Sequence, residues 1–134
     1  MPFKGSCHCG AVAYEIDNLA TPIGHCFCVT CRKTHAAASK PNARVKVDAL
    51  RWLRGEELLT GYRSSAEKTR RFCSRCGSHV IAHRDGQDSY TLSVATLDDD
   101  PGLRSAGAIW LSEAAPWCED DLSKPRFAET PLAL

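Results

Sequence analysis

The sequence predicts a mostly β domain of short antiparallel strands with little helix, and two observations lead to this expectation. Short runs rich in β-branched, aromatic and other apolar residues recur at close intervals, and turn signals separate them. Only one stretch suits a helix, and it is short. Short strands at such spacing are typical of a mostly antiparallel β domain.

The elements are predicted in the following order. Val12, Tyr14 and Ile16 alternate with small or polar residues, which indicates a strand with one buried face, and Asp17-Asn18 ends it. The cysteine-dense segment 26–31 fits neither regular period and is typical of a metal knuckle, and residues 29–38 form a short predicted helix. The remaining predictions are strands around Val45 and Val47 and at 58–62, 69–73, 79–83, 90–94 and 108–111, turns at Gly55, Gly61 and Asp85-Gly86, and an irregular tail marked by Pro116, Pro125 and Pro131.

Length and composition indicate one globular domain spanning residues 1–134. Hydrophobic residues make up 43% and charged residues 25% of the chain, and the formal net charge is only +1, which argues against nucleic acid as a partner. The sequence shows no signal-peptide core and no run of ~20 apolar residues that would span a membrane. We therefore expect a cytoplasmic protein without membrane contact. In that compartment, its eight cysteines point to metal or redox chemistry.

Seven of the eight cysteines fall into three clusters. Cysteines one or two residues apart can face a single tetrahedral ion, and zinc takes four such ligands in a closed structural site. The clusters are Cys7 and Cys9, then Cys26, Cys28 and Cys31, then Cys73 and Cys76. The first and last clusters together supply four sulfurs, and the middle cluster supplies three. The sequence therefore predicts two zinc ions, one of them with an open coordination position.

The open position carries the functional argument. A closed zinc site is structural, whereas three protein ligands and a free position are typical of catalysis. Three thiolates leave a bound zinc with a net charge near −1, so it is a weaker Lewis acid than a site of three histidines. Such a site suits a thiolate substrate better than difficult hydrolysis.

Three other interpretations of the cysteines remain open at this point. Cys118, His25 or His35 could close the second site as an eighth ligand. The C-x-x-C pairs could cycle through a disulfide, although no thioredoxin-like pattern surrounds them. The middle cluster could also be an exposed knuckle without chemistry.

The ordered motifs resemble the family of glutathione-dependent formaldehyde-activating enzymes, grouped with centromere-protein-V-like zinc domains. Three cysteine clusters in this order, together with tryptophan motifs near the C-terminus, make the resemblance specific over nearly the whole chain. The matching segments are 5–16, 26–33, 62–65, 71–78, 109–110, 116–117, 120–122 and 125–127.

The resemblance implies a β-tent fold of sheets pinned by zinc. It implies that Cys7, Cys9, Cys73 and Cys76 hold a structural zinc, and that Cys26, Cys28 and Cys31 hold a catalytic zinc. The activity it implies is that of a carbon–sulfur lyase, which joins glutathione and formaldehyde as S-hydroxymethylglutathione or reverses that step. The partners would be a glutathione-like thiol and a small aldehyde. The alternative is a non-catalytic, zinc-stabilised module that binds a protein or another partner.

Several further residues are candidates for supporting roles. His25 or His35 could shuttle a proton to the new hydroxyl group. Gly10 and Gly77 follow cysteine pairs and would permit the turns that direct backbone amides at thiolate sulfurs. The cations expected to pair with glutathione carboxylates are Arg32, Lys33, Arg63 and Arg71. Trp52, Trp110 and Trp117 are expected to pack in the core or cover a zinc site, and Cys118 to be a buried or spare thiol.

Overall fold

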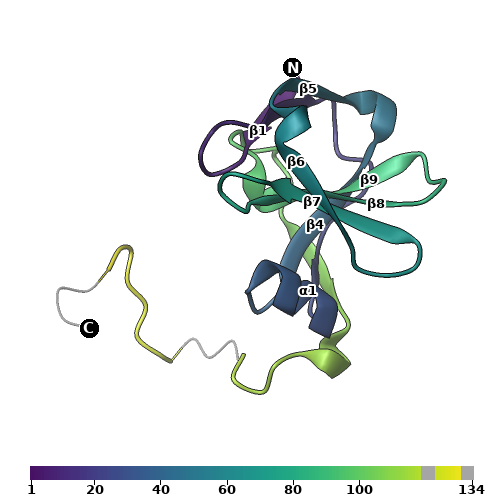
Figure 1. Cartoon of the computed structure of the whole chain (residues 1–134). Coiled ribbons are helices and arrows are strands. Elements are labelled where there is room, and N and C mark those ends of the chain that lie inside the picture. The colour runs from purple at the N-terminus through teal and green to yellow at the C-terminus, as the bar shows by residue number, and fades with distance from the viewer. Residues whose placement is uncertain (119–122, 131–134) are drawn as a thin grey trace.

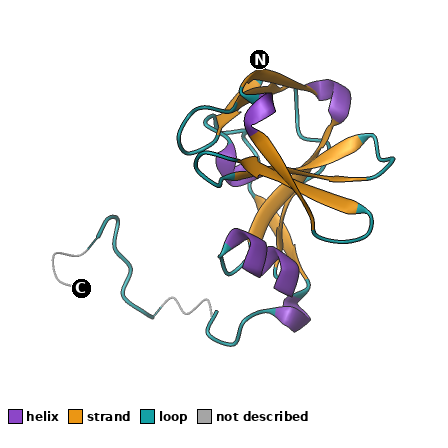
Figure 2. Ribbon diagram, in the orientation of Figure 1, coloured by secondary structure: helices purple, strands orange, loops and turns teal. Residues whose placement is uncertain are grey.

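The computed structural model describes residues 1–118 and 123–130, and strands dominate it (Figures 1 and 2). A small sheet has the strand order β1 (Phe3–Ser6), β2 (Ala13–Ile16), β5 (Leu50–Arg54). A larger sheet has the order β10 (Ser105–Ile109), β3 (Ile23–Cys26), β4 (Lys40–Lys46), β9 (Ser89–Ser93), β8 (His79–Arg84), β7 (Lys68–Cys73), β6 (Leu59–Arg63). The helical elements are α1 (Val29–His35) and the short 3-10 turns η1 (Val47–Ala49), η2 (Glu56–Leu58), η3 (Val94–Thr96) and η4 (Leu111–Glu113). The prediction of a mostly β tent with little helix is confirmed.

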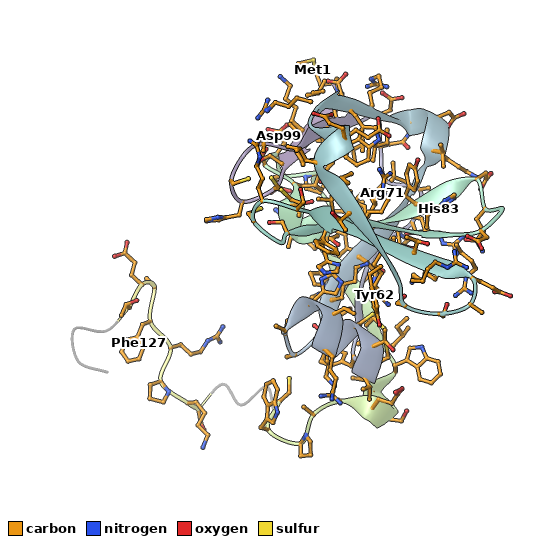
Figure 3. The ribbon with its side chains drawn as sticks, in the orientation of Figure 1. Met1, Tyr62, Arg71, His83, Asp99 and Phe127 are labelled. Carbon is orange, nitrogen blue, oxygen red and sulfur yellow. The ribbon has the colours of Figure 1, made fainter. Side chains whose placement is uncertain are left out.

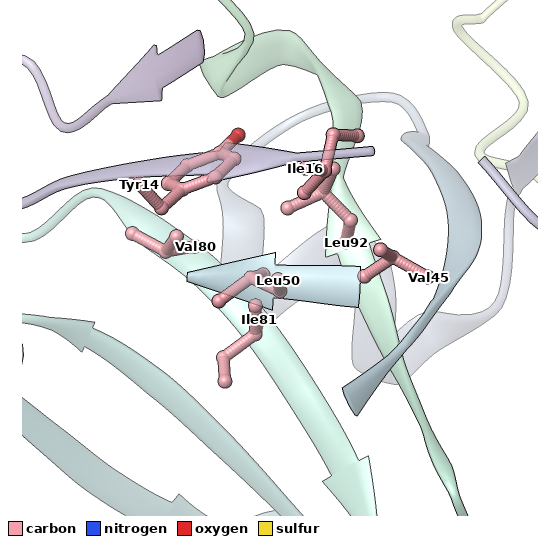
Figure 4. Close-up of a cluster of buried hydrophobic side chains, with 7 residues drawn as sticks. All are labelled: Tyr14, Ile16, Val45, Leu50, Val80, Ile81 and Leu92. Atoms are coloured by element: carbon pink, nitrogen blue, oxygen red, sulfur yellow. The ribbon is translucent and has the colours of Figure 1, made fainter. Parts of the chain in front are cut away.

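The main core lies between the two sheets. The alternation predicted for the first strand is confirmed, because β2 buries Tyr14 and Ile16 and leaves Glu15 partly exposed. Side chains from β4, β5, β8 and β9 meet these two residues (Figure 4); they are Val45, Leu50, Val80, Ile81 and Leu92. Burial of apolar surface at about 25 cal/mol per Å² is the main stabilising contribution of such a cluster. A second, smaller cluster packs Val12 against the sulfurs of Cys7 and Cys73.

The structure corrects several predicted elements. The strands β1, β3 and β5 were not predicted; β1 and β3 show no clear alternation of apolar and polar residues, whereas β5 does alternate at Leu50, Arg51 and Trp52. Gly61, expected in a turn, lies inside β6 opposite Arg71, and Val47 begins a 3-10 turn instead of continuing a strand. The final strand spans 105–109 and not 108–111, and it pairs with β3 in parallel, in contrast to the antiparallel pairing elsewhere.

The remaining expectations for the C-terminal part are met only in part. Trp52 packs against both core clusters, as expected. Trp110 is exposed and not in the core, but it lines a pocket together with Cys26, Cys28 and Cys31, which agrees with the expectation that a tryptophan covers a candidate zinc site. Trp117 is exposed beside Arg32 and Lys33, so the expectation that it packs in the core is wrong. Residues 123–130 form no helix or strand, and Phe127 on this segment lies apart from the sheets (Figure 3). Motif residues 120–122 and Pro131 lie outside the described residues. Within the described part, no helix combines the length and apolarity needed to cross a membrane.

Candidate metal centres and pocket

Four cysteines from two distant turns meet at one point. Cys7 and Cys9 lie in the turn between β1 and β2, whereas Cys73 ends β7 and Cys76 lies in the turn before β8. All four sulfurs lie within 4.8 Å of one another, with 3.6 Å between those of Cys7 and Cys9 and 3.9 Å between those of Cys9 and Cys73. Tetrahedral zinc with bonds of about 2.3 Å requires sulfurs roughly 3.8 Å apart. This four-cysteine cluster therefore fits a zinc ion.

The surroundings of the four-cysteine cluster favour the thiolate form at Cys7 and Cys76, whereas at Cys9 a backbone hydrogen bond is outweighed by the neighbouring thiols, which raise its pKa to about 11. Gly10 and Gly77 adopt φ angles of 79° and 80°, the left-handed region in which glycine is favoured, as the sequence predicted for these turns. The Val12 amide donates a hydrogen bond to the Cys7 sulfur over 3.3 Å. Hydrogen bonds from the Ser78 hydroxyl and backbone lower the pKa of the Cys76 thiol to about 5. A thiol with so low a pKa is already ionised for a metal at neutral pH.

The second group, the three-cysteine cluster, lies where β3 passes into α1. Cys26 ends the strand, Cys28 is the N-cap of the helix, and Cys31 lies in its first turn, with their sulfurs all within 4.8 Å. The backbone amide of Cys31 donates to the Cys28 sulfur over 3.3 Å, which fixes the cap. Among the described residues, neither Cys118 nor any histidine joins this cluster. The donor set is therefore three thiols of a kind that zinc binds, with no fourth protein ligand of this type.

A buried arginine faces the three-cysteine cluster from β7. Both terminal guanidinium nitrogens of Arg70 lie near the Cys31 sulfur, at 3.8 and 3.7 Å, and its Nε donates to the Ser64 hydroxyl over 3.0 Å. Burial works against ionisation of Cys31, yet hydrogen bonds from the neighbouring thiols and from Arg70 outweigh it and lower its pKa. Burial raises the pKa of Cys26 to about 12. Against the effect of burial, the neighbouring thiols and Arg70 together favour the thiolate form of Cys31.

An open pocket of about 440 Å³ includes the three-cysteine cluster in its wall. This volume is in the range of small-molecule sites. Its other lining residues are polar, charged or apolar side chains from α1, from the large sheet and from its connecting segments, namely Thr30, Lys40, Asn42, Ser64, Ser65, Lys68, Arg70, Arg84, Thr91, Ile109, Trp110 and Glu113. Burial, together with the charges of Arg70 and Lys68, lowers the pKa of Lys40 to about 8.

The two candidate proton shuttles do not line this pocket. His25 is half-buried, and its Nδ1 lies 3.3 Å from the Ser39 hydroxyl. The His35 ring packs against that of His79, with 4.8 Å between centroids. Burial and nearby positive charges lower the pKa of His35 to about 3, so it is neutral at physiological pH. Neither histidine is therefore placed for proton transfer at the cluster.

The four cations proposed for carboxylate binding also lie outside the pocket. Arg63 forms an ion pair with Asp85 at 2.9 Å. Arg71 lies over the ring of Trp52, 5.9 Å from its centroid, and Figure 3 shows it away from α1. Arg32 and Lys33 line a separate surface depression beside Trp117.

Sequence reasoning missed the cations that do line the pocket. Lys68 and Arg70 are two residues apart on β7, so they share one face of the strand, while Arg71 points to the other face. The strand at 69–73 was predicted, so the alternation of side chains along a strand could have placed Arg70 and Arg71 on opposite faces. Lys40 gave no such signal, because the start of β4 was not predicted. Trp110 could not be placed from the sequence, because it adopts a left-handed conformation with a φ angle of 60° that turns the chain at the pocket rim.

The fold and the two sulfur clusters define a mostly β, cysteine-rich protein with two sites that could hold metal ions. Comparison with known families is specific: the family model described as glutathione-dependent formaldehyde-activating enzyme matches residues 2–113. The chain belongs to this family.

Individual relatives agree with this assignment. A curated Halomonas elongata protein named "Putative glutathione-dependent formaldehyde-activating enzyme" is 34% identical over an alignment of 85 residues that covers 58% of this chain. The match spans 54% of that protein, so the chain matches about half the length of this curated relative. A crystal structure of a Rhodobacter sphaeroides protein is 29% identical, with a TM-score of 0.64 and coverage of 78% of this chain and 98% of the other.

Proposed function

We propose that the protein is a zinc-dependent carbon–sulfur lyase or synthase that acts on adducts of a glutathione-like thiol and a small aldehyde. The observation that carries the proposal is the unequal division of sulfurs, four in one cluster and three in the other, with the pocket opening on the three. The family assignment and the name of the Halomonas elongata relative supply the thiol and the aldehyde. Because the cysteines must stay reduced, the proposal includes a cytoplasmic location.

The four-cysteine cluster would hold a structural zinc. Its ligands join the β1–β2 turn to the β7–β8 turn, so a metal there ties the small sheet to the large one. The free energy of metal binding at such a site is also free energy of folding.

The three-cysteine cluster would hold the catalytic zinc. A zinc ion bound there supplies an open coordination position and lowers the pKa of a thiol placed at it. The reaction forms a bond between the thiol sulfur and the carbonyl carbon, the carbon–oxygen π bond breaks, and the thiol proton ends on the new hydroxyl oxygen. Because the uncatalysed condensation is not difficult, positioning both reactants together supplies much of the gain.

The pocket walls suit an anionic thiol and a small aldehyde. Lys68 lines the pocket beyond the sulfurs and offers a donor for a carboxylate of the thiol. Ile109 and Trp110 add apolar surface to the pocket, and both side chains are exposed to solvent.

Single cysteine substitutions test the proposal. Cys28→Ala is expected to release one of two bound zinc ions and to abolish turnover, while cooperative unfolding is retained. Cys73→Ala is expected to disrupt the fold, because it opens the structural site. Zinc content is measured by elemental analysis, and turnover by the NMR exchange rate between formaldehyde and S-hydroxymethylglutathione, with the uncatalysed rate subtracted.

The opposite results would reject the proposal. Full turnover in Cys28→Ala would show that the three-cysteine cluster takes no part in the chemistry. A wild-type protein that binds two zinc ions but does not accelerate the exchange would favour the zinc-stabilised binding module instead.

A further inference from the structure

Two buried cations flank the three-cysteine cluster. Lys40 is 2% exposed and lies opposite Cys26 in the pairing of β3 with β4. Arg70 is 4% exposed and directs its guanidinium group at Cys31. Among residues 1–118 and 123–130, no carboxylate forms an ion pair with either of them. A buried cation without a counter-charge is costly, so both cations depend on the negative charge of the sulfurs.

The other charged groups of the pocket largely balance one another. Lys68 and Glu113 carry opposite charges, and Arg84 forms an ion pair with Glu67 at 3.1 Å. What remains is Lys40, Arg70 and the three cysteines. Three thiolates and one zinc ion carry a net charge of −1, while the two buried cations carry +2. The filled cluster together with these two cations is therefore one negative charge short of neutrality.

We propose that Lys40 and Arg70 are specificity-determining residues that reserve the fourth ligand position beside Cys26, Cys28 and Cys31 for an anion, a thiolate, in preference to a neutral donor. This inference rests on the proposed function, since it assumes a metal at the three-cysteine cluster. A thiolate brings the local charge to zero, whereas water or an imidazole leaves two buried cations facing a single negative charge. The selection acts on the charge of the ligand atom itself, apart from any carboxylate elsewhere on the substrate.

The test compares an anionic with a neutral ligand on the full chain loaded with Co²⁺ at both clusters. The probes are 2-mercaptoethanol, whose only ionisable group is its thiol, and imidazole, which binds as a neutral ligand. Each is titrated at fixed pH, and the visible absorption of the Co²⁺ ion reports binding. Only the three-cysteine cluster responds, because the four-cysteine cluster has no open position.

Lys40→Met and Arg70→Met are expected to weaken 2-mercaptoethanol binding about tenfold each, the order expected for losing one unit charge in a partly buried site. Imidazole binding is expected to stay the same or to tighten. Arg70→Lys keeps the charge and should keep the preference for the thiol. The matched control is Lys33→Met, which removes a lysine of α1 outside the pocket and should change neither affinity.

Equal loss of both ligands in Lys40→Met, or unchanged thiol binding in Lys40→Met and Arg70→Met, would overturn the inference. If Arg70→Met does not load Co²⁺, Lys40→Met and Arg70→Lys decide the question. Failure of the proposed function is distinct, because it would appear in the wild-type protein as Co²⁺ that responds to neither ligand or as an absence of turnover.

Discussion

Gly55 follows β5 and lies against the backbone of Ala11 and Val12, which leads out of the turn that carries Cys7 and Cys9. It adopts a φ angle of 75°, and a Cβ atom added there would overlap the carbonyl oxygen of Ala11 and lie 2.8 Å from its carbonyl carbon and 2.9 Å from the Cα of Val12. All three neighbours are backbone atoms, so no side chain can rotate away. Gly55→Ala must therefore push apart β5 and the segment that carries Val12, which packs against Cys7 and Cys73.

The magnitude follows from two separate costs. Placing alanine in a left-handed conformation costs about 1–2 kcal/mol, of which about 0.4–1 kcal/mol is returned because alanine restricts the unfolded chain. Displacing packed backbone adds about 1–3 kcal/mol. We expect Gly55→Ala to lower the free energy of unfolding by about 3 kcal/mol, a large part of the 5–15 kcal/mol typical of a whole domain.

A matched variant separates the two costs. Gly86, in the β8–β9 turn, has a φ angle of 77° but no atom within 4 Å of an added Cβ, so Gly86→Ala should cost only about 1 kcal/mol. Urea unfolding of both zinc-loaded variants gives the free energies, and elemental analysis gives their zinc content. If Gly55→Ala and Gly86→Ala differ by less than about 0.5 kcal/mol, the argument from the close approach to Ala11 is refuted.

Two further predictions concern buried polar side chains. Because the pKa of His35 is lowered to about 3 in the fold and is about 6.5 when unfolded, the unfolded chain binds an extra proton below pH 6.5, and stability falls as the pH drops toward 3. Between pH 7 and pH 5, the free energy of unfolding of His35→Gln, measured with urea, should fall by roughly 1–2 kcal/mol less than that of the wild type. Equal falls in the two proteins would contradict this. Tyr14→Phe removes a 2.7 Å hydrogen bond to the Thr96 hydroxyl, which keeps its bond to the Ser93 carbonyl. Tyr14→Phe should lower the free energy of unfolding by about 1 kcal/mol. A decrease above about 3 kcal/mol in the same assay would mean that the phenylalanine also disturbs the core.

The two sulfur clusters were predictable from the sequence because their signal is local. Cysteines one or two residues apart must lie close in any fold, and the counts of four and three follow once the outer pairs meet. The structure brings Cys7 and Cys9 to Cys73 and Cys76, as the sequence predicted. The metal itself and the different roles of the two clusters stay predictions.

The lining of the pocket could not be predicted in the same way. Lys40 enters it only because β4 pairs with β3, and neither β3 nor the start of β4 has a clear alternation. The cations chosen from the sequence were next to cysteines or motif residues along the chain, but strand parity turns Arg71 away and Arg63 pairs with Asp85. Closeness in sequence is enough to locate the candidate metal ligands. The face to which a side chain points depends instead on how its strand pairs with the neighbouring strands.

Because the late strand β10 pairs with the early strand β3, the clustered cysteines are synthesised before part of the pocket that they line. All seven clustered cysteines precede residue 77, whereas Ile109 ends β10 and Trp110 follows it, and β10 pairs with the strand that ends at Cys26. In a growing chain, the seven clustered thiols are thus made before the part of the pocket wall that lies beside them. Binding of a metal at the proposed sites and completion of the pocket can therefore be distinct events, and a chain shortened before residue 105 would keep the clustered cysteines while losing Ile109 and Trp110.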